Sequence, residues 1–144
     1  MITQGQCGSF RSELLNGYHA FSSAYRAADT FKIALYTSAA NLNPATTTVY
    51  TTSEEVTGTG YAAGGIVLVP TAPANSGVVA YESFANAVWS GASFTANGAL
   101  IYNSTQANRA VAILAFGGNK TPIGSIFTVQ FPVNGSTTSV LRFY

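Results

Sequence analysis

Residues 94–118 place the tightest constraint on the fold of this chain. The segment holds two apolar runs, residues 99–102 and 110–116, on either side of a polar stretch at residues 103–109. Two such runs joined by a short polar loop are typical of an antiparallel β-hairpin. Because the second run, AVAILAF, is almost wholly apolar, both of its faces are expected to contact protein rather than water. The hairpin is therefore predicted to form the centre of a β core.

Six further segments have the length and pattern of β-strands. In the first of them Phe31, Ile33 and Leu35 alternate with Lys32, Ala34 and Tyr36, so the two sets are expected on opposite faces. The six segments are residues 31–37, 64–70, 78–84, 87–90, 125–132 and 138–144. With the central hairpin they give about eight strands, which predicts an all-β fold: an antiparallel β-sandwich or jelly roll with a short N-terminal helical arm.

The first 30 residues differ from the rest. Apolar side chains recur there at a spacing of three to four, at Phe10, Leu14, Leu15, Tyr18 and Phe21. This spacing predicts a short amphipathic helix, with Gly8 or Ser9 at its start and Gly17 near its end. So short a helix is not stable alone in water and must pack on its own sheet or on a neighbouring subunit. The chain is accordingly divided into an arm, residues 1–30, and a β-sandwich domain, residues 31–144.

Residues 38–60 are rich in Thr, Ser, Asn and Gly and hold few apolar anchors. They predict a long surface loop with one short strand around residues 48–52. Long loops in compact domains are commonly functional or rest on a partner. This loop and residues 1–28 of the arm are therefore the candidate surfaces for clamping a partner. The alternative, that both segments fold back on their own domain, is equally open at this point.

Charged residues make up 8% of the chain, about a third of the usual share, and the net charge is +1. Nothing here favours nucleic-acid binding, because there is no basic run. The N-terminus lacks the pattern of a secretory signal and no apolar run reaches the roughly 20 residues of a membrane span, so synthesis in a cytoplasm is expected. So little charge predicts a surface made mostly of Ser, Thr, Asn, Gly and Ala, or one that is largely covered by partners.

No residue pattern predicts a catalytic, cofactor-binding or metal site. Glu54 and Glu55 are adjacent and are expected to be solvated loop acids that point to opposite faces. His19 and Cys7 are the only residues of their kinds, too few for a zinc site within one chain. Cys7 is expected to be a small buried apolar group and His19 to lie on the helix surface.

Several segments occur together in a fixed order: KIALYTSAANL (residues 32–42), TTVYTTSEEVTGTGYAAGG (47–65), Trp89 with FTANGALIYN (94–103), AVAILAFGGNKT (110–121) and FTVQFP (127–132). With the opening CGSFRSELLNGYHAF (7–21), this set resembles a group of small tailed-phage virion proteins over nearly the whole chain. In that group an acidic residue precedes the double glycine, whereas this chain has Ala115 and Phe116 at that place. No binding role is therefore inferred for the position.

The resemblance implies an all-β virion structural protein without cofactor or catalytic residues. Some members of the group are similar to capsid cement or decoration proteins, and others to tail-fibre components. The resemblance thus implies a homo-oligomer, expected to be a trimer, that binds the major capsid protein on the outside of the virion. The alternative is a tail-fibre or host-adsorption module that binds a cell-surface glycan.

Overall fold

The computed structural model describes residues 1–144 and confirms an all-β fold with one short N-terminal helix. It has ten strands rather than eight, two of them in segments that the sequence pattern did not predict as strands. The elements are β1 (Gly5–Gln6), α1 (Gly8–Leu15), β2 (Phe31–Tyr36), β3 (Ile66–Leu68), β4 (Ala74–Ser76), β5 (Val79–Glu82), β6 (Ala87–Ala92), β7 (Ala96–Asn103), β8 (Arg109–Lys120), β9 (Ser125–Val129) and β10 (Leu141–Phe143).

The predicted central hairpin is confirmed. β7 and β8 pair antiparallel, and they lie inside a five-stranded antiparallel sheet of order β1-β8-β7-β2-β3. β7 is buried along nearly its whole length, and β8 is buried from Ala110 to Ile113. The ladder between them is irregular at two points, between Ala96 and Gly98 and between Ile101 and Tyr102.

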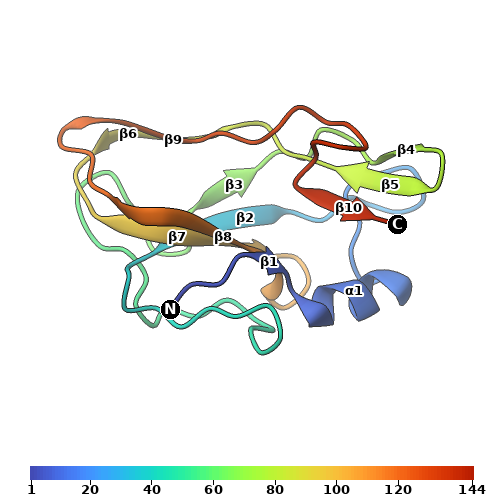
Figure 1. Cartoon of the computed structure of the whole chain (residues 1–144), viewed down its shortest axis with the longest axis horizontal. Helices are drawn as coiled ribbons and strands as arrows, with labels where there is room; N and C mark the ends of the chain where they lie inside the picture. Colours follow the sequence, from blue (N-terminus) through green and yellow to red (C-terminus); the bar gives the residue numbers. More distant parts are fainter.

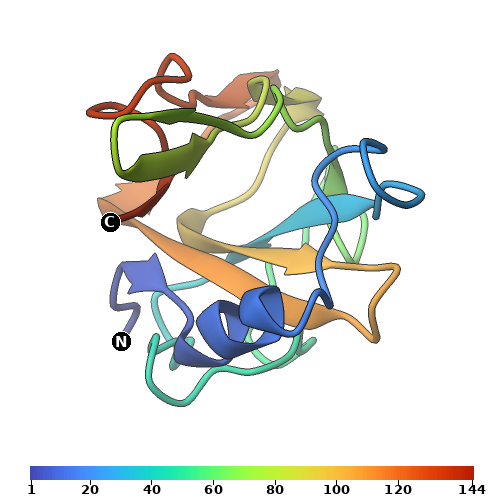
Figure 2. The same ribbon diagram turned by 90° about the vertical axis from the view of Figure 1, so that its right-hand side faces the viewer.

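Each face of the five-stranded sheet has its own cover. The β6–β9 ribbon and the three-stranded sheet of order β10-β5-β4 lie over one face (Figures 1 and 2). The loop between β2 and β3 and the first residues of the chain run along the opposite side of the sheet (Figure 1). A sheet covered on both faces needs apolar residues on both, which explains why β2 and β7 are not half polar.

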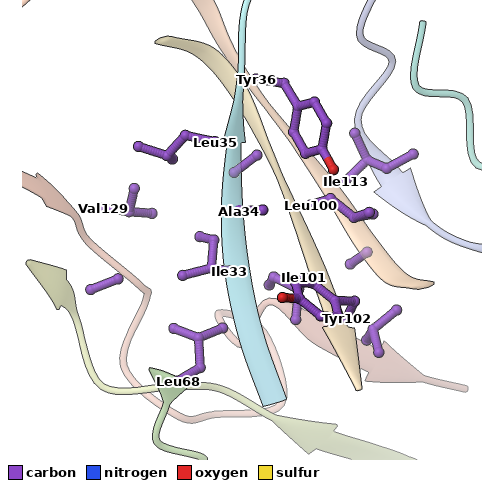
Figure 3. Close-up of a cluster of buried hydrophobic side chains, with 14 of the residues drawn as sticks. Ile33, Ala34, Leu35, Tyr36, Leu68, Leu100, Ile101, Tyr102, Ile113 and Val129 are labelled. Atoms are coloured by element: carbon purple, nitrogen blue, oxygen red, sulfur yellow. The ribbon is translucent and has the colours of Figure 1, made fainter. Parts of the chain in front are cut away.

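The alternation predicted for β2 is confirmed, although both of its faces are buried. Leu35 and Ile33 point toward Val129 of β9 and Leu68 of β3, whereas Tyr36 lies on the other side of the strand (Figure 3). Phe31 stacks on Phe21 with ring centroids 4.3 Å apart and an interplanar angle of 6°. This stack joins the segment after α1 to the core, where an aromatic pair adds to the effect of its buried area.

The N-terminal helix is confirmed but is shorter and less amphipathic than predicted. It ends at Leu15, so Tyr18 and Phe21 follow it, and Phe10 is its only buried residue. Leu15 is 91% exposed. The residue that precedes the helix is Cys7, which makes no side-chain capping bond, so the prediction of a start capped by Gly8 or Ser9 was wrong. No helix in the structure has the length and apolar character needed to cross a membrane.

Three strand predictions need correction. Residues 71–77, which lie between two predicted strands, contain a further strand, β4, which pairs with β5. The strand predicted at residues 64–70 is limited to β3, which is an edge strand; Val67 and Val69, the latter just after the strand, are more than half exposed. Around residues 48–52 there is a single bridge, from Val49 to Arg109, in place of a short strand. Short edge strands carry too few apolar side chains to be recognised by periodicity.

Gly65 marks the point where the long loop enters β3. Its φ is +72°, and a Cβ added there would lie 1.7 Å from the carbonyl oxygen of Ile33 on β2. Only glycine can occupy this place, because both the backbone conformation and the close approach of the neighbouring strand exclude a side chain.

We therefore expect Gly65→Ala to cost more than about 4 kcal/mol in unfolding free energy, measured by urea denaturation. Gly77→Ala is the matched control, because Gly77 has a φ of +57° and no atom within 4 Å of a Cβ. The unfolding free energy of the control should fall only by the cost of the left-handed backbone conformation, about 1–2 kcal/mol. Equal losses in the two variants would contradict the close approach to Ile33.

Candidate functional site

An uncharged outer face is formed by β3 and by β6 with its partner β9. Val67 of β3 and Val69, just after the strand ends, flank the buried Leu68 and so point outward. On β6 Val88 is exposed between Ala87 and Trp89, both of which are buried. Ile126 of β9 is 68% exposed. β3 and β6 lie next to one another, and β6 pairs with β9. We call the outward sides of these three strands the β3–β6–β9 face.

The three strands of this face carry no charge of their own, although Lys32 of β2 lies directly opposite Val67 in the β2–β3 ladder. Neither β3, β6 nor β9 contains an Asp, Glu, Lys or Arg residue. Single exposed apolar residues are normal on protein surfaces, but several together on neighbouring strands are characteristic of contact sites. The exposed edge of a sheet is normally protected by charge, by proline or by a short edge strand; β3 has three residues and no charge, and Pro70 lies two residues after its end.

The two segments predicted as clamps fold on their own domain. The N-terminal amine donates to the carbonyl oxygen of Ala40 at 2.7 Å, and Thr3 donates its backbone N–H to Leu42 at 2.9 Å. Gly8 donates its N–H to the carbonyl of Pro44 at 2.8 Å. The arm and the long loop therefore bond to each other. Of the two alternatives left open by the sequence, the structure shows the one in which both segments fold back on their own domain.

The prediction for Glu55 was wrong, because its carboxylate is an organising group rather than a solvated one. It accepts hydrogen bonds from the hydroxyl groups of Tyr50 at 2.7 Å and Tyr61 at 2.6 Å, and from the N–H of Gly64 at 2.7 Å. Burial and the bond to Glu55 raise the pKa of both tyrosines. Glu54, by contrast, is exposed as expected. Glu55 thus joins the middle of the long loop to the segment just before β3.

The prediction for His19 was also wrong. The residue lies after the helix, and its side chain is fully buried between Glu13 and Asn103. Burial lowers the pKa of His19 and outweighs the hydrogen bond to Glu13, so the ring is neutral at pH 7. Asn103 Nδ2 donates to Nδ1 at 2.9 Å, which leaves the proton on Nε2 to donate to Glu13 Oε2 at 2.8 Å. Arg109 pairs with the same glutamate.

Asn103 is the hub of this buried cluster. Its Nδ2 atom donates to His19 and, at 2.8 Å, to Asp29 Oδ2, while its Oδ1 accepts the N–H groups of Thr105 and Gln106 at 3.1 Å each. All four hydrogen-bonding positions of the amide are thus filled. Both ring nitrogens of His19 are filled too, so the cluster has no free acid or base in this arrangement and acts as a structural clamp.

Sequence reasoning missed Asn103. The available signal was local: an Asn at the end of an apolar strand, followed by Ser, Thr and Gln, is typical of an Asx turn. That pattern explains the bonds to Thr105 and Gln106. It does not contain the partners His19 and Asp29, which are 84 and 74 residues away.

Cys7 is fully buried, as predicted. Burial, with a smaller contribution from Glu13, raises the pKa of its thiol to about 12. A thiol with so high a pKa is protonated at neutral pH and is a poor nucleophile. No group of three or more His, Cys, Asp or Glu side chains is placed to hold a metal ion.

No protein-family model, no curated protein and no solved structure matches this chain.

Asp29 gives the buried cluster a measurable pH dependence. Burial raises the pKa of its carboxyl, but hydrogen bonds from Arg26, Asn103, Ala20 and Gln106 outweigh burial and bring it from 3.8 to about 2. The folded state therefore holds the proton less tightly than the unfolded chain. The resulting stabilisation is complete above about pH 4 and is lost as the pH falls toward 2.

We expect Asp29→Asn to lower the unfolding free energy at pH 7 by about 2 kcal/mol, the equivalent of the shift at 1.36 kcal/mol per pKa unit. The difference in unfolding free energy between the variant and the wild type should narrow as the pH is lowered from 4 to 2. Urea denaturation at each pH measures this difference. Glu54→Gln, at an exposed carboxylate, is the control and should show no such gap. A gap for Asp29→Asn that stays constant from pH 7 to pH 2 would contradict this assignment.

Proposed function

We propose that this chain is a bacteriophage virion structural protein that decorates the capsid: it binds the assembled shell and stabilises it. The observation that carries the proposal is the uncharged β3–β6–β9 face with its exposed valine and isoleucine side chains. The cores of protein interfaces are depleted of charged residues, and this face has the same property. The resemblance of the sequence to small tailed-phage virion proteins supports the same function.

The proposed partners are the major capsid protein and further copies of the chain. A closed oligomer, for which a trimer is expected, would present the same patch several times to a symmetric shell. A protein that binds the assembled shell and not its free subunits stabilises the shell by mass action. Such a role requires no catalytic group, only a rigid domain with an adhesive surface. The Asn103 and Glu55 clusters supply rigidity: Asn103 of β7 binds Asp29 of the segment after α1, and Tyr61, which donates to Glu55, accepts the N–H of Leu35 on β2.

The second candidate is a tail-fibre or host-adsorption module that binds a glycan. The observation in its favour is the exposure of aromatic rings: Tyr25 and Tyr144 lie almost wholly on the surface, and Tyr18 is 40% exposed. Exposed tyrosines are suited to stacking on sugar rings. Few charged groups surround them, however: Arg26 follows Tyr25, and Arg142 lies two residues before Tyr144.

Quantitative protein analysis and imaging of purified virions distinguish the two functions. A capsid decoration protein is expected in roughly hundreds of copies on the head, and a tail component in roughly tens or fewer, because of the symmetry of each assembly. Absence of the chain from the head would refute the proposed decoration function. A small number of copies at the tail, with binding of the isolated protein to host cells, would favour the adsorption module.

The contact face can be tested with Ile126→Lys. Because Ile126 is 68% exposed in the free chain, the change should leave the melting temperature nearly unaltered. In a shell contact the lysine would be buried without a partner, so affinity for shells lacking the protein should fall at least about tenfold. Val133→Lys, in the loop before β10 and 83% exposed, is the matched control and should bind as the wild type does. Equal binding by both variants would exclude β9 from the contact.

A further inference from the structure

The outer edge of β9 is the longest regular strand edge that the fold leaves without a partner. β9 has five residues and pairs only with β6. The extra residue of the irregular β6–β9 ladder lies on β6, between Trp89 and Ala92, so β9 itself is unbroken. The outermost strands of the other two sheets, β1, β3, β4 and β10, have only two or three residues each. On the far side of the ribbon, β6 lies next to β3.

The backbone groups along this edge have no partner within the chain. In an antiparallel ribbon, alternate residues of a strand direct their N–H and C=O groups toward the partner strand, and the others direct theirs away from it. Apart from the ladder with β6, no backbone group of Ser125–Val129 takes part in a hydrogen bond. β9 contains neither a charged residue nor a proline, which are the usual protection of a sheet edge. The edge can therefore pair with the backbone of another strand.

A hollow of about 370 Å³ lies beside the same edge. Its lining comes from β8, from β9 and from the residue after β9: Phe116, Lys120, Phe127, Thr128, Val129 and Gln130. Because no residue of β6 or β7 lines it, the hollow lies on the side of β9 that faces away from β6. β8 and β9 belong to different layers and are joined at one end of the molecule (Figure 1). A strand added to β9 would direct every second side chain toward this hollow, where the two phenylalanine rings suit an apolar group.

Lys120 gives the hollow a single positive charge. Its side chain is exposed and forms no salt bridge, and no other residue of the lining is charged. A strand that carries a carboxylate at this point is complementary to it. A second copy of the chain has no such strand to offer, because Glu82 of β5 is the only acidic residue in any strand and is buried. Charge therefore favours a strand from a different protein.

We propose that the free edge of β9 binds an extended segment of a partner protein as an additional strand, with an apolar side chain beside Phe116 and an acidic side chain next to Lys120. Backbone hydrogen bonds supply the affinity, and the hollow and its charge supply the specificity. The inference does not depend on the partner being a capsid protein. It concerns the edge of β9, whereas Ile126→Lys tests the outward side of the same strand, so the two proposals can fail separately.

The probe is the peptide DTVTVTD, acetylated and amidated at its ends. As a strand it has its valines and carboxylates on one face, and an acid at each end allows either strand direction to reach Lys120. NMR titration of the isotopically labelled protein measures affinity and locates the site. Backbone amide shifts are expected at Ser125–Val129 and at Lys120.

Two further peptides separate backbone pairing from charge. DTVTVTD methylated at every backbone nitrogen has no N–H donors and should not bind. KTVTVTK should bind about threefold more weakly or less tightly still, because repulsion replaces attraction at an exposed lysine. No measurable binding of DTVTVTD, equal affinity for the methylated peptide, or shifts confined to other parts of the chain would overturn the proposal.

Lys120→Glu tests the role of the charge. The variant should prefer KTVTVTK to DTVTVTD by about threefold or more, the reverse of the wild-type preference. Because Lys120 is exposed and forms no salt bridge, the melting temperature should change little. Arg11→Glu makes the same change of charge at an exposed residue of α1 outside the hollow and should keep the wild-type preference. An unchanged preference in Lys120→Glu, or the same reversal in Arg11→Glu, would contradict a strand seated beside Lys120.

Pairing of β9 with a second copy is the other occupant that can be detected. Hydrogen exchange of the amides of Ser125–Val129 is followed by NMR at increasing protein concentration, with analytical ultracentrifugation in parallel. The amides that do not face β6 should exchange rapidly at every concentration and become protected when DTVTVTD is added. Protection that grows with protein concentration in the absence of peptide, together with formation of a dimer, would overturn the proposal in favour of a second copy.

Discussion

The arrangement of this protein follows from the burial of β7 on both faces. β7 is the middle strand of the five-stranded sheet, with β8 on one side and β2 on the other. Because its side chains are apolar in both directions, neither face can be left to water. The chain therefore supplies two covers: the β6–β9 ribbon and the β10-β5-β4 sheet on one face, and the loop after β2 with the N-terminus on the other (Figure 1). The unusual length of that loop is explained by the face it has to cover.

The loop that covers one face of the sheet forms few backbone hydrogen bonds with it. Polar side chains hold the loop in place instead. Glu55 joins Tyr50, Tyr61 and the backbone of Gly64, so one carboxylate organises three parts of the long loop. Asn103 likewise joins the segment after α1 to the β7–β8 turn through His19 and Asp29. Fully satisfied networks of this kind specify one arrangement, because any alternative packing would leave charged groups buried without partners.

The placement of acidic side chains in these clusters also explains why the surface carries so few negative charges. Of the five acidic side chains, only Glu54 is exposed, since Glu13, Asp29 and Glu55 are held in hydrogen-bonded clusters and Glu82 is buried. Little charge is left for the outside, and β3, β6 and β9 have none. Glu82 departs from the pattern, because one of its oxygens has no partner in the folded chain. Both the uncharged strands and the buried Glu82 thus follow from a chain that has few ionisable groups and places most of its acidic ones inside.

The sequence by itself determined the all-β class, the central hairpin, the two faces of β2 and the helix near the N-terminus, because each depends on a local periodicity of apolar residues. It also predicted the burial of Cys7. Only the tertiary structure decided the positions of the polar residues. His19 and Glu55 were expected at the surface and are built into clusters, since their partners lie in segments that periodicity does not connect. The edge position of β3 and the existence of β4 likewise depend on which strands meet in space. Hydrophobic spacing is a property of neighbouring residues, whereas the pairing of a buried charge depends on contacts between residues far apart in the chain.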